Sequence, residues 1–199
     1  SEQREAFELD GFDSTLTKEA VVGMVPVMEA EGLEELAALA KANNCRTMLE
    51  IGTAVARTAV YMAEQGLTVT TIERDPDMIR QARRNIAESG QSVRLVEADA
   101  READIQGTFD LIFIDAAKSQ YRRFFERYAP LLSEHGIIVT DNMKFHGMVD
   151  HPERTQNRHT RGLIRRLREY RQYLESLEDW ETEFLDDRGD GIAVSRRKR

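Results

Sequence analysis

Residues 47–76 read TMLEIGTAVARTAVYMAEQGLTVTTIERDP and predict a strand, a helix and a second strand in succession. The strand patterns cover Thr47–Ile51 and residues 69–73, and a helical pattern covers residues 58–65 between them. Asp75 and Pro76 then suit the N-cap and the first position of another helix, which we expect to run to about residue 89. The stretch therefore predicts the start of an alternating α/β fold.

The alternation continues beyond this stretch and then breaks near the end of the chain. Further strands are predicted at Val93–Glu97, 111–115, 137–141, Trp180–Leu185 and 191–195, and further helices at 120–132 and 157–177. The last two strands flank a turn-rich loop and predict an antiparallel pair at the sheet edge. We expect a doubly wound, Rossmann-like α/β fold with a mostly parallel seven-stranded sheet, an antiparallel C-terminal hairpin strand and helices on both faces.

Length and composition indicate one soluble globular domain. The 199 residues suit a single domain at 1–199, with a helical N-terminal segment at 1–46 and a Rossmann-like core at 47–199. The net charge of -8 argues against general binding to nucleic acids or membranes. The single Cys45 rules out an internal disulfide and suits a reducing cytosol. With no apolar run of about 20 residues and no secretory pattern at residues 1–10, we expect a cytoplasmic protein that does not span a membrane. Residue 1 is Ser rather than an initiator Met, which suggests that the native start is missing.

Two of the predicted strands end in oxygen-bearing side chains. An apolar run ends at Asp115, and another ends at Asp141 and Asn142. The carboxyl ends of parallel strands meet at one edge of a sheet, where the ligand sites of α/β proteins lie. Oxygen donors alone suit a hard divalent cation such as Mg²⁺ rather than zinc. Lys118 follows the first aspartate and could serve as a base beside that ion.

The ends of the first two strands suggest a nucleoside cofactor. Gly52 after the first strand lets the backbone approach a ligand closely. Glu73 ends the second strand at the spacing expected of a carboxylate that binds a ribose diol, and Asp99 follows the third, where an adenine amino group would lie. NAD and S-adenosylmethionine both remain candidates on this pattern. The incomplete G-x-G-x-x-G pattern and the acidic strand ends favour the cationic S-adenosylmethionine.

Five segments of the chain resemble the cation-dependent O-methyltransferases, the family of catechol and caffeoyl-CoA O-methyltransferases. These are residues 48–54, 71–75, 109–118, 140–142 and 189–194, within a resemblance that spans roughly 25–195. Residues 25–29 and 119–125 are similar to a bacterial branch of this family that methylates 5-hydroxyuridine at the tRNA wobble position. The resemblance also implies a homodimer.

The resemblance implies a role for each matching residue. It assigns metal binding to Asp115, Asp141 and Asn142, catalysis as the base to Lys118, and cofactor contacts to Met28, Glu50, Gly52, Thr53, Thr58, Glu73, Asp99 and Asp115. The expected metal is Mg²⁺, with Mn²⁺ or Ca²⁺ as alternatives. Three positions depart from the family pattern. Ala56 stands where the family has a second glycine, Arg57 replaces an aromatic residue, and His146 is unusual in the segment expected to set substrate selectivity.

The chemistry implied by this family leaves the substrate open. Methyl transfer from a sulfonium is an in-line displacement, so the acceptor oxygen must be deprotonated and aligned with the methyl carbon. A metal ion chelated by two neighbouring substrate oxygens would do both, with Lys118 as the proton acceptor. Catechols and 5-hydroxyuridine each offer two such oxygens.

Arginines concentrate in one predicted helix and the segment before it. Residues 151–173 contain seven arginines and two glutamates. The stripe Arg158, Arg161, Arg165 and Arg168 lies opposite an apolar stripe of Leu163, Leu167, Tyr170, Leu174 and Leu177, and Arg122, Arg123 and Arg127 add charge on another helix. On an acidic chain this pattern favours a phosphate-binding surface. The alternative is a solvated helix face with ion pairs.

We therefore predict a metal- and S-adenosylmethionine-dependent O-methyltransferase that acts on 5-hydroxyuridine in the tRNA anticodon loop. A small catechol-like phenol is the alternative substrate. A cofactor-binding protein without catalysis is the second alternative, and Ala56 and Arg57 are the residues that favour it.

Overall fold

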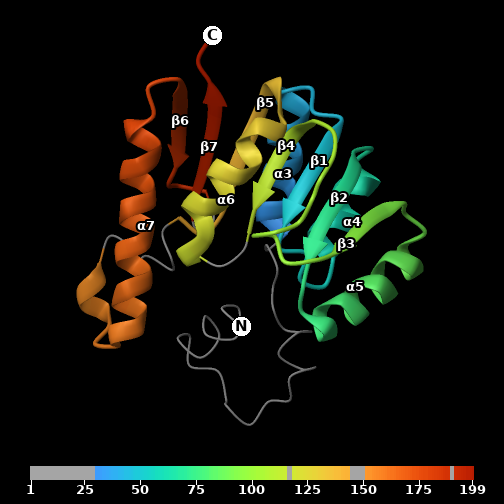
Figure 1. The fold of residues 1–199 in the computed structure, drawn as a ribbon, viewed down its shortest axis with the longest axis horizontal. Helices are drawn as coiled ribbons and strands as arrows, with labels where there is room; N and C mark the ends of the chain where they lie inside the picture. The colour runs from blue at the N-terminus through green and yellow to red at the C-terminus, as the bar shows by residue number, and fades with distance from the viewer. Residues whose placement is uncertain (1–29, 116–117, 144–150, 189–190) are drawn as a thin grey trace.

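The computed structural model describes residues 30–115, 118–143, 151–188 and 191–199, which form helices around one seven-stranded sheet (Figure 1). The strands are β1 (Thr47–Ile51), β2 (Thr68–Glu73), β3 (Val93–Glu97), β4 (Phe109–Ile114), β5 (Leu132–Thr140), β6 (Trp180–Leu185) and β7 (Ile192–Arg197). The helices are α3 (Ala30–Ala42), α4 (Arg57–Glu64), α5 (Pro76–Ser89), α6 (Tyr121–Tyr128) and α7 (Arg158–Ser176), with short 3-10 helices η1 (Lys118–Gln120), η2 (Ala129–Leu131) and η3 (Pro152–Arg154).

The order of the strands places a switch point at the centre of the sheet. The order is β3-β2-β1-β4-β5-β7-β6, with β1 to β5 parallel to one another and β7 antiparallel to both β5 and β6. The chain runs outward from β1 to β3 and then returns to β4 on the other side of β1. In sheets of this kind, ligands bind at the carboxyl ends of the strands where the direction of winding reverses. The predicted fold is confirmed, and it places the candidate residues around β1 and β4.

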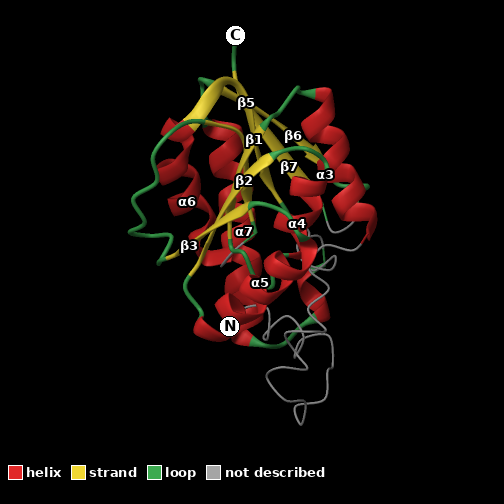
Figure 2. Cartoon of the chain, turned by 90° about the vertical axis from the view of Figure 1, so that its right-hand side faces the viewer, coloured by secondary structure: helices red, strands yellow, loops and turns green. Residues whose placement is uncertain are grey.

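Helices cover both faces of the sheet because its central strands are apolar on both sides. Leu49, Ile51 and Ile112 belong to the core that contains α6 and α7 side chains. Met48 and Leu111 belong to the second core, which contains side chains of α3, α4 and α5. Figure 2 shows α6 and α3 on opposite sides of the strands. The alternating direction of strand side chains thus builds two cores from one sheet.

Local signals in the sequence set most element boundaries. Asp75 caps α5, and its Oδ1 accepts hydrogen bonds from the backbone N–H groups of Asp77 at 2.9 Å and Met78 at 3.3 Å. Asn157 caps α7 in the same way, with Oδ1 accepting from Thr160 N at 3.1 Å. The N-cap predicted at Asp75 and the predicted antiparallel β6–β7 pair are therefore found in the structure, whereas the cap at Asn157 was not predicted.

One predicted boundary is wrong. The helix expected at 120–132 ends at Tyr128, and the chain passes through η2 into β5, which starts at Leu132 rather than at residue 137. Pro130 explains the early end of the helix, because proline donates no backbone hydrogen bond and so interrupts the helical ladder.

The N-terminal prediction is only partly covered by the structure. Of the helical segment expected at residues 1–46, the structure describes α3, and residues 1–29 lie outside the described part. The division into one domain stays a prediction. Within the described ranges, no helix is both long and apolar enough to cross a membrane.

Candidate active site

The turn after β1 contains three residues with positive φ. Gly52, Ala54 and Ala56 have φ angles of 98°, 49° and 69°. The backbone N–H groups of Gly52 and Thr53 both donate to Ile72 O at 3.1 Å, which fixes the turn against β2. A left-handed conformation costs a residue with a side chain about 1–2 kcal/mol. The left-handed backbone at Ala56 gives a physical reason for the glycine that the family resemblance implies at this position, and such strain is typical of ligand-binding turns.

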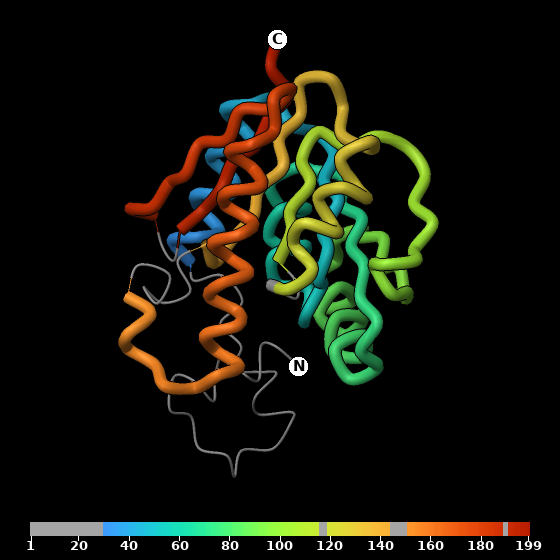
Figure 3. Tube along the Cα trace, turned by 60° about the vertical axis from the view of Figure 1, so that its left-hand side comes forward, coloured from blue at the N-terminus to red at the C-terminus, as the bar shows by residue number. Residues whose placement is uncertain are grey.

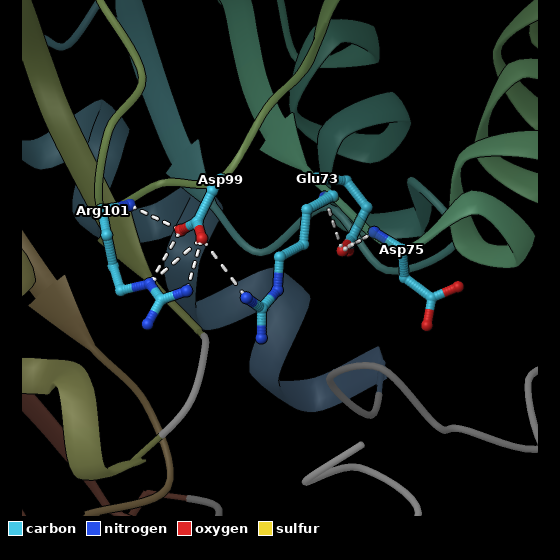
Figure 4. A network of polar contacts seen from close by, with 5 residues as sticks. Glu73, Asp75, Asp99 and Arg101 are labelled. Atoms are coloured by element: carbon cyan, nitrogen blue, oxygen red, sulfur yellow. Dashed lines mark hydrogen bonds and ion pairs between the residues drawn. The ribbon is translucent and has the colours of Figure 1, made fainter.

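Glu73 joins the end of β2 to this turn. Its Oε1 accepts the Ala54 N–H at 2.9 Å, and its Oε2 accepts the N–H groups of Arg74 at 3.0 Å and Asp75 at 3.2 Å (Figure 4). Burial raises the pKa of Glu73, and these backbone hydrogen bonds oppose the rise. The carboxylate predicted to bind a ribose diol is thus held in a fixed place beside the β1 turn.

Glu50, a buried residue of β1, lies at the end of a chain of hydroxyls. The Thr71 hydroxyl donates to Glu50 Oε1 at 2.7 Å and lies 2.6 Å from the Thr53 hydroxyl. Burial raises the pKa of Glu50 well above its ordinary value; the hydrogen bond from Thr71 lowers the pKa, while the nearby charges of Asp115 and Glu73 raise it further. Three neighbouring carboxyl groups favour a cation among them, as a sulfonium cofactor would supply.

Asp99 lies across from Glu73 and is held by two arginines (Figure 4). Arg101 Nη2 lies 2.6 Å from Asp99 Oδ2, the Arg101 backbone N–H donates to Oδ1 at 2.9 Å, and Arg74 Nη1 lies 3.3 Å from Oδ2. The hydrogen bond from the Arg101 side chain is the main reason that the pKa of Asp99 is lowered. The sequence predicted Asp99 as an adenine contact but not these two arginines. In the sequence, these arginines are marked only by their positions close to Glu73 and Asp99.

Thr58, in the first turn of α4, has a hydroxyl group that is available for a hydrogen bond to a ligand. The side chain is buried, and its hydroxyl has no hydrogen-bond partner among the described residues. Buried hydroxyls in folded proteins nearly always have a partner. The orphaned Thr58 hydroxyl therefore fits the prediction that a bound cofactor completes this site, whereas Arg57 beside it is exposed to solvent.

The strand register brings the predicted metal-binding residues together. Ile114 pairs with Thr140 in the β4–β5 ladder, so Asp115 and Asp141 follow neighbouring positions on adjacent strands. Asp115 N donates to Ile51 O at 3.1 Å, which places it beside Gly52 as well. Asp141 is buried, and Asn142 has a left-handed φ of 57°. The two carboxylates and the amide thus come from neighbouring strand ends at the switch point.

Several predicted site residues lie partly or wholly outside the described structure. Lys118 begins η1, shortly after Asp115, but its side chain is not among those described. Met28 and His146 lie in segments outside the described residues. In the described part of the chain, no three His, Cys, Asp or Glu side chains are grouped to hold a metal. The candidate set contains only two carboxylates together with the Asn142 amide, so the metal stays a prediction.

The predicted arginine surface lies along α7. Its apolar stripe is buried, whereas Arg158, Arg161, Arg165 and Arg168 are exposed. Arg165 lies 4.0 Å from Glu169, while Arg154, Arg158, Arg161 and Arg166 have no ion pair with a described carboxylate. Figures 1 and 3 show that α7 begins near the end of the molecule to which the carboxyl ends of β1, β2 and β4 point.

Other arginines of the predicted basic set have structural partners. Arg122 pairs with Glu126 at 3.0 Å and lies 4.4 Å above the Tyr173 ring. Arg127 donates to Ala103 O at 2.8 Å, and Arg171 lies 3.3 Å from Asp186. These three residues stabilise packing between elements, so the candidate phosphate-binding surface narrows to the first half of α7, the segment before it and the exposed Arg123.

The doubly wound sheet, the strained turn after β1 and the acidic end of β2 define a Rossmann-like protein of the methyltransferase type. The family model described as O-methyltransferase matches residues 5–198, and the chain belongs to this family. The resemblance seen in the sequence is thereby confirmed at the level of the family, whereas the tRNA-modifying branch stays a proposal.

Individual relatives agree with this placement. A putative caffeoyl-CoA O-methyltransferase from Staphylococcus aureus is 33% identical, with a TM-score of 0.83 and 99% of both chains covered. The SAH-bound methyltransferase PaMTH1 from Podospora anserina is 25% identical, with a TM-score of 0.79 over 99% of this chain and 88% of that one. A putative caffeoyl-CoA O-methyltransferase from Arabidopsis thaliana is 30% identical over 192 residues, covering 87% of this chain and 77% of that protein.

Some curated relatives are matched over only part of their length. The catechol O-methyltransferase of Niastella koreensis is 33% identical over 129 residues, which are 59% of this chain and 57% of that protein. The glycine/sarcosine N-methyltransferase of Parasynechococcus marenigrum is matched over 46% of its length. The chain thus spans about half the length of these two proteins.

Proposed function

We propose that this protein transfers the methyl group of S-adenosylmethionine to an oxygen of its substrate with the help of a divalent cation. The observation that carries the proposal is the placement of β1 between two acidic sites. Glu73 lies on its β2 side, and Asp115 and Asp141 lie on its β4 side. A nucleoside held by Glu73 would have its sulfonium directed past Gly52 toward the strand ends that contain Asp115 and Asp141.

The residues around the turn after β1 suit the parts of S-adenosylmethionine. Glu73 would accept hydrogen bonds from the ribose hydroxyls, and Asp99 would accept one from the adenine amino group once Arg74 gives way. Glu50 and its neighbouring carboxyl groups would favour the positive charge of the cofactor. The SAH-bound form of the Podospora anserina relative supports the same cofactor here.

The donor set at the ends of β4 and β5 suits a hard cation. Asp115, Asp141 and Asn142 would hold it through oxygen atoms, as Mg²⁺ requires, and Mn²⁺ or Ca²⁺ would be accepted by the same donors. When bound, the ion would supply charge stabilisation for a deprotonated substrate oxygen. Lys118 is the first residue of η1 and follows Asp115 closely in the sequence. It is the proposed acceptor of the substrate proton.

We further propose that the substrate is 5-hydroxyuridine at the wobble position of tRNA. The exposed arginines at the start of α7 support a polyanionic substrate. Among the described residues, no carboxylate forms an ion pair with Arg158 or Arg161, whereas solvated helix faces usually pair such charges with carboxylates. The second candidate is a small catechol-like phenol, which the catechol O-methyltransferase relative favours. The family resemblance also leads us to propose a homodimer, which light scattering on the purified protein would test.

A labelling experiment separates these substrates. The protein would be incubated with methyl-labelled S-adenosylmethionine, Mg²⁺ and either tRNA that carries unmethylated 5-hydroxyuridine or a panel of catechols. We expect label in the wobble nucleoside of the tRNA. Labelled catechols with unlabelled tRNA would replace the tRNA proposal with the phenol one. Cofactor binding without transfer to either substrate would support the non-catalytic alternative.

A further inference from the structure

Two buried tyrosines from different helices meet at the carboxyl end of β5. The Tyr121 hydroxyl, at the start of α6, donates to the backbone oxygen of Asp141 at 3.2 Å. The Tyr170 hydroxyl, on α7, lies 3.0 Å from the Thr140 hydroxyl. The two rings are in edge-to-face contact with 5.5 Å between their centroids. Adjacent residues of one strand end are thus each bonded to a tyrosine.

The surroundings of these hydroxyls indicate a specific role for them. Both rings lie in the apolar core between the sheet and the helices α6 and α7. A phenylalanine could fill the same space, and burying a hydroxyl group is unfavourable unless it forms hydrogen bonds. Burial also raises the pKa of Tyr170, so this hydroxyl remains neutral. The hydrogen bonds of the two hydroxyls therefore hold the end of β5 in a fixed position from Thr140 to Asp141.

The next residue shows why this backbone needs to be held. Asn142 has a left-handed φ of 57°, a conformation that asparagine adopts more readily than most residues other than glycine and that turns the chain sharply. Directly after it, Met143 N donates to Gly191 O at 3.1 Å, which ties the chain to the start of β7. The strand end is therefore held by α6, α7 and β7 while the chain makes this turn.

We propose that Tyr121 and Tyr170 are positioning residues that direct the Asp141 carboxylate and the Asn142 amide toward one cation. The inference rests on the proposed function, because it assigns these two side chains to a metal site. Neither tyrosine contacts the ion. Each acts through the backbone or side chain of the strand end that presents the ligands, as residues behind metal ligands commonly do.

The test removes each hydroxyl and measures metal binding without catalysis. Tyr121→Phe and Tyr170→Phe proteins, freed of metal with EDTA, would be titrated with Mn²⁺ and followed by electron paramagnetic resonance. We expect the Kd for Mn²⁺ to rise about tenfold in each variant. The affinity for S-adenosylhomocysteine should stay at the wild-type value. In activity assays the KM for Mg²⁺ should rise while kcat at saturating Mg²⁺ is largely retained.

Tyr128→Phe provides a matched control on the same helix. Tyr128 is also buried, and its hydroxyl also donates to a backbone oxygen, that of Ala100, which lies beside β3 rather than β5. This variant should bind Mn²⁺ like the wild type. Thermal unfolding in EDTA would measure the loss of stability that all three variants share.

The outcomes distinguish this inference from the proposed function. Wild-type Mn²⁺ affinity in Tyr121→Phe and Tyr170→Phe, or an equal loss in Tyr128→Phe, would overturn the positioning role and leave the metal site standing. If the wild-type protein itself bound no Mn²⁺ and methylated its substrate in EDTA, the metal site would be wrong and this inference would fall with it.

Discussion

The carboxylate of Glu73 accepts the backbone N–H of Ala54 at 2.9 Å, so the acidic end of β2 and the left-handed turn after β1 form one rigid unit. The two residues are far apart in the sequence and come from strands that pair in parallel. A cofactor bound between them would therefore meet a preformed site, which reduces the cost of ordering protein groups on binding.

Glu73→Gln should disrupt this unit. One carboxylate oxygen becomes an NH₂ group, which cannot accept from Ala54 or from Arg74 and Asp75. We expect the affinity for S-adenosylhomocysteine to fall about 10- to 100-fold, measured by calorimetry. Glu97→Gln is the control, because Glu97 pairs with Glu73 in the β2–β3 register but is exposed. Equal affinities in the two variants would remove Glu73 from the cofactor site.

The backbone strain at Ala56 leads to a second prediction. Ala56→Gly would relieve a left-handed conformation worth about 1–2 kcal/mol but lose a buried methyl group worth about 0.8 kcal/mol. The two effects oppose each other, so the free energy of unfolding in urea should stay within about 1 kcal/mol of the wild-type value.

Ala59→Gly is the matched control for that substitution. Ala59 is equally buried, but it lies inside α4, where glycine weakens the helix by up to about 1 kcal/mol and the methyl group is lost as well. We expect the Ala59 variant to be less stable by about 1–2 kcal/mol. Similar losses in the two glycine variants would show that Ala56 carries no strain.

The elements that the sequence predicted correctly are those with local signals. The start of α5 follows from the neighbouring residues Asp75 and Pro76, because capping acts within three residues. The start of β5 was missed because the polar residues 133–135 and Gly136 separate Leu132 from the apolar run that follows. At Gly136 an added Cβ would lie 2.6 Å from the Leu132 side chain and 2.8 Å from Asp110 O, and the β4–β5 register shifts between Phe109 and Leu111. These close contacts form only in the paired strands, so the sequence pattern of β5 alone does not reveal the need for that glycine.

The candidate site shows the same difference between features with local sequence signals and features that depend on contacts between distant elements. The proximity of Asp115 to Asp141 and Asn142 could be predicted because these residues follow two different strands, and the parallel arrangement brings strand ends together. The contact between Arg74 and Asp99 and the contacts of the two tyrosines with β5 were not predicted. They join residues 20 to 30 positions apart, on elements whose relative placement follows only from the packed fold.

The raised pKa of Glu50 predicts a pH-dependent stability. Because burial raises this pKa in the folded state, the folded protein binds a proton more tightly than the unfolded chain, whose glutamates titrate near pH 4.5. The contribution of Glu50 to stability is therefore full below that pH and is lost as the pH rises through the folded pKa. Glu50→Gln removes this loss, so its stability advantage over the wild type should grow between pH 5 and pH 8 in urea unfolding.

Two further measurements complete that test. The exposed Glu64→Gln variant on α4 should show no such trend with pH. Glu50→Gln should also bind S-adenosylmethionine more weakly at pH 8, because it lacks the negative charge beside the proposed sulfonium position. A stability difference that is constant with pH would show that Glu50 titrates alike in the folded and unfolded states.

The last prediction concerns the arginines at the start of α7. Arg158→Glu with Arg161→Glu reverses two exposed charges that have no ion pair with a described carboxylate. Arg161 Nε donates one hydrogen bond, to Thr155 O at 3.1 Å, so thermal unfolding of the variant is compared with that of the wild type. If these side chains bind tRNA phosphates, tRNA affinity should fall at least about tenfold at moderate salt. The slope of log affinity against log salt should fall by about one for each phosphate that the variant no longer neutralises. Methylation of a free catechol should be unchanged.

Arg84→Glu with Arg94→Glu is the matched control for this variant. It makes the same charge change at two exposed arginines on α5 and β3, at the opposite edge of the sheet, and should leave tRNA binding nearly intact. A similar loss of tRNA affinity in both double variants would mean that net charge alone, rather than the α7 surface, governs binding.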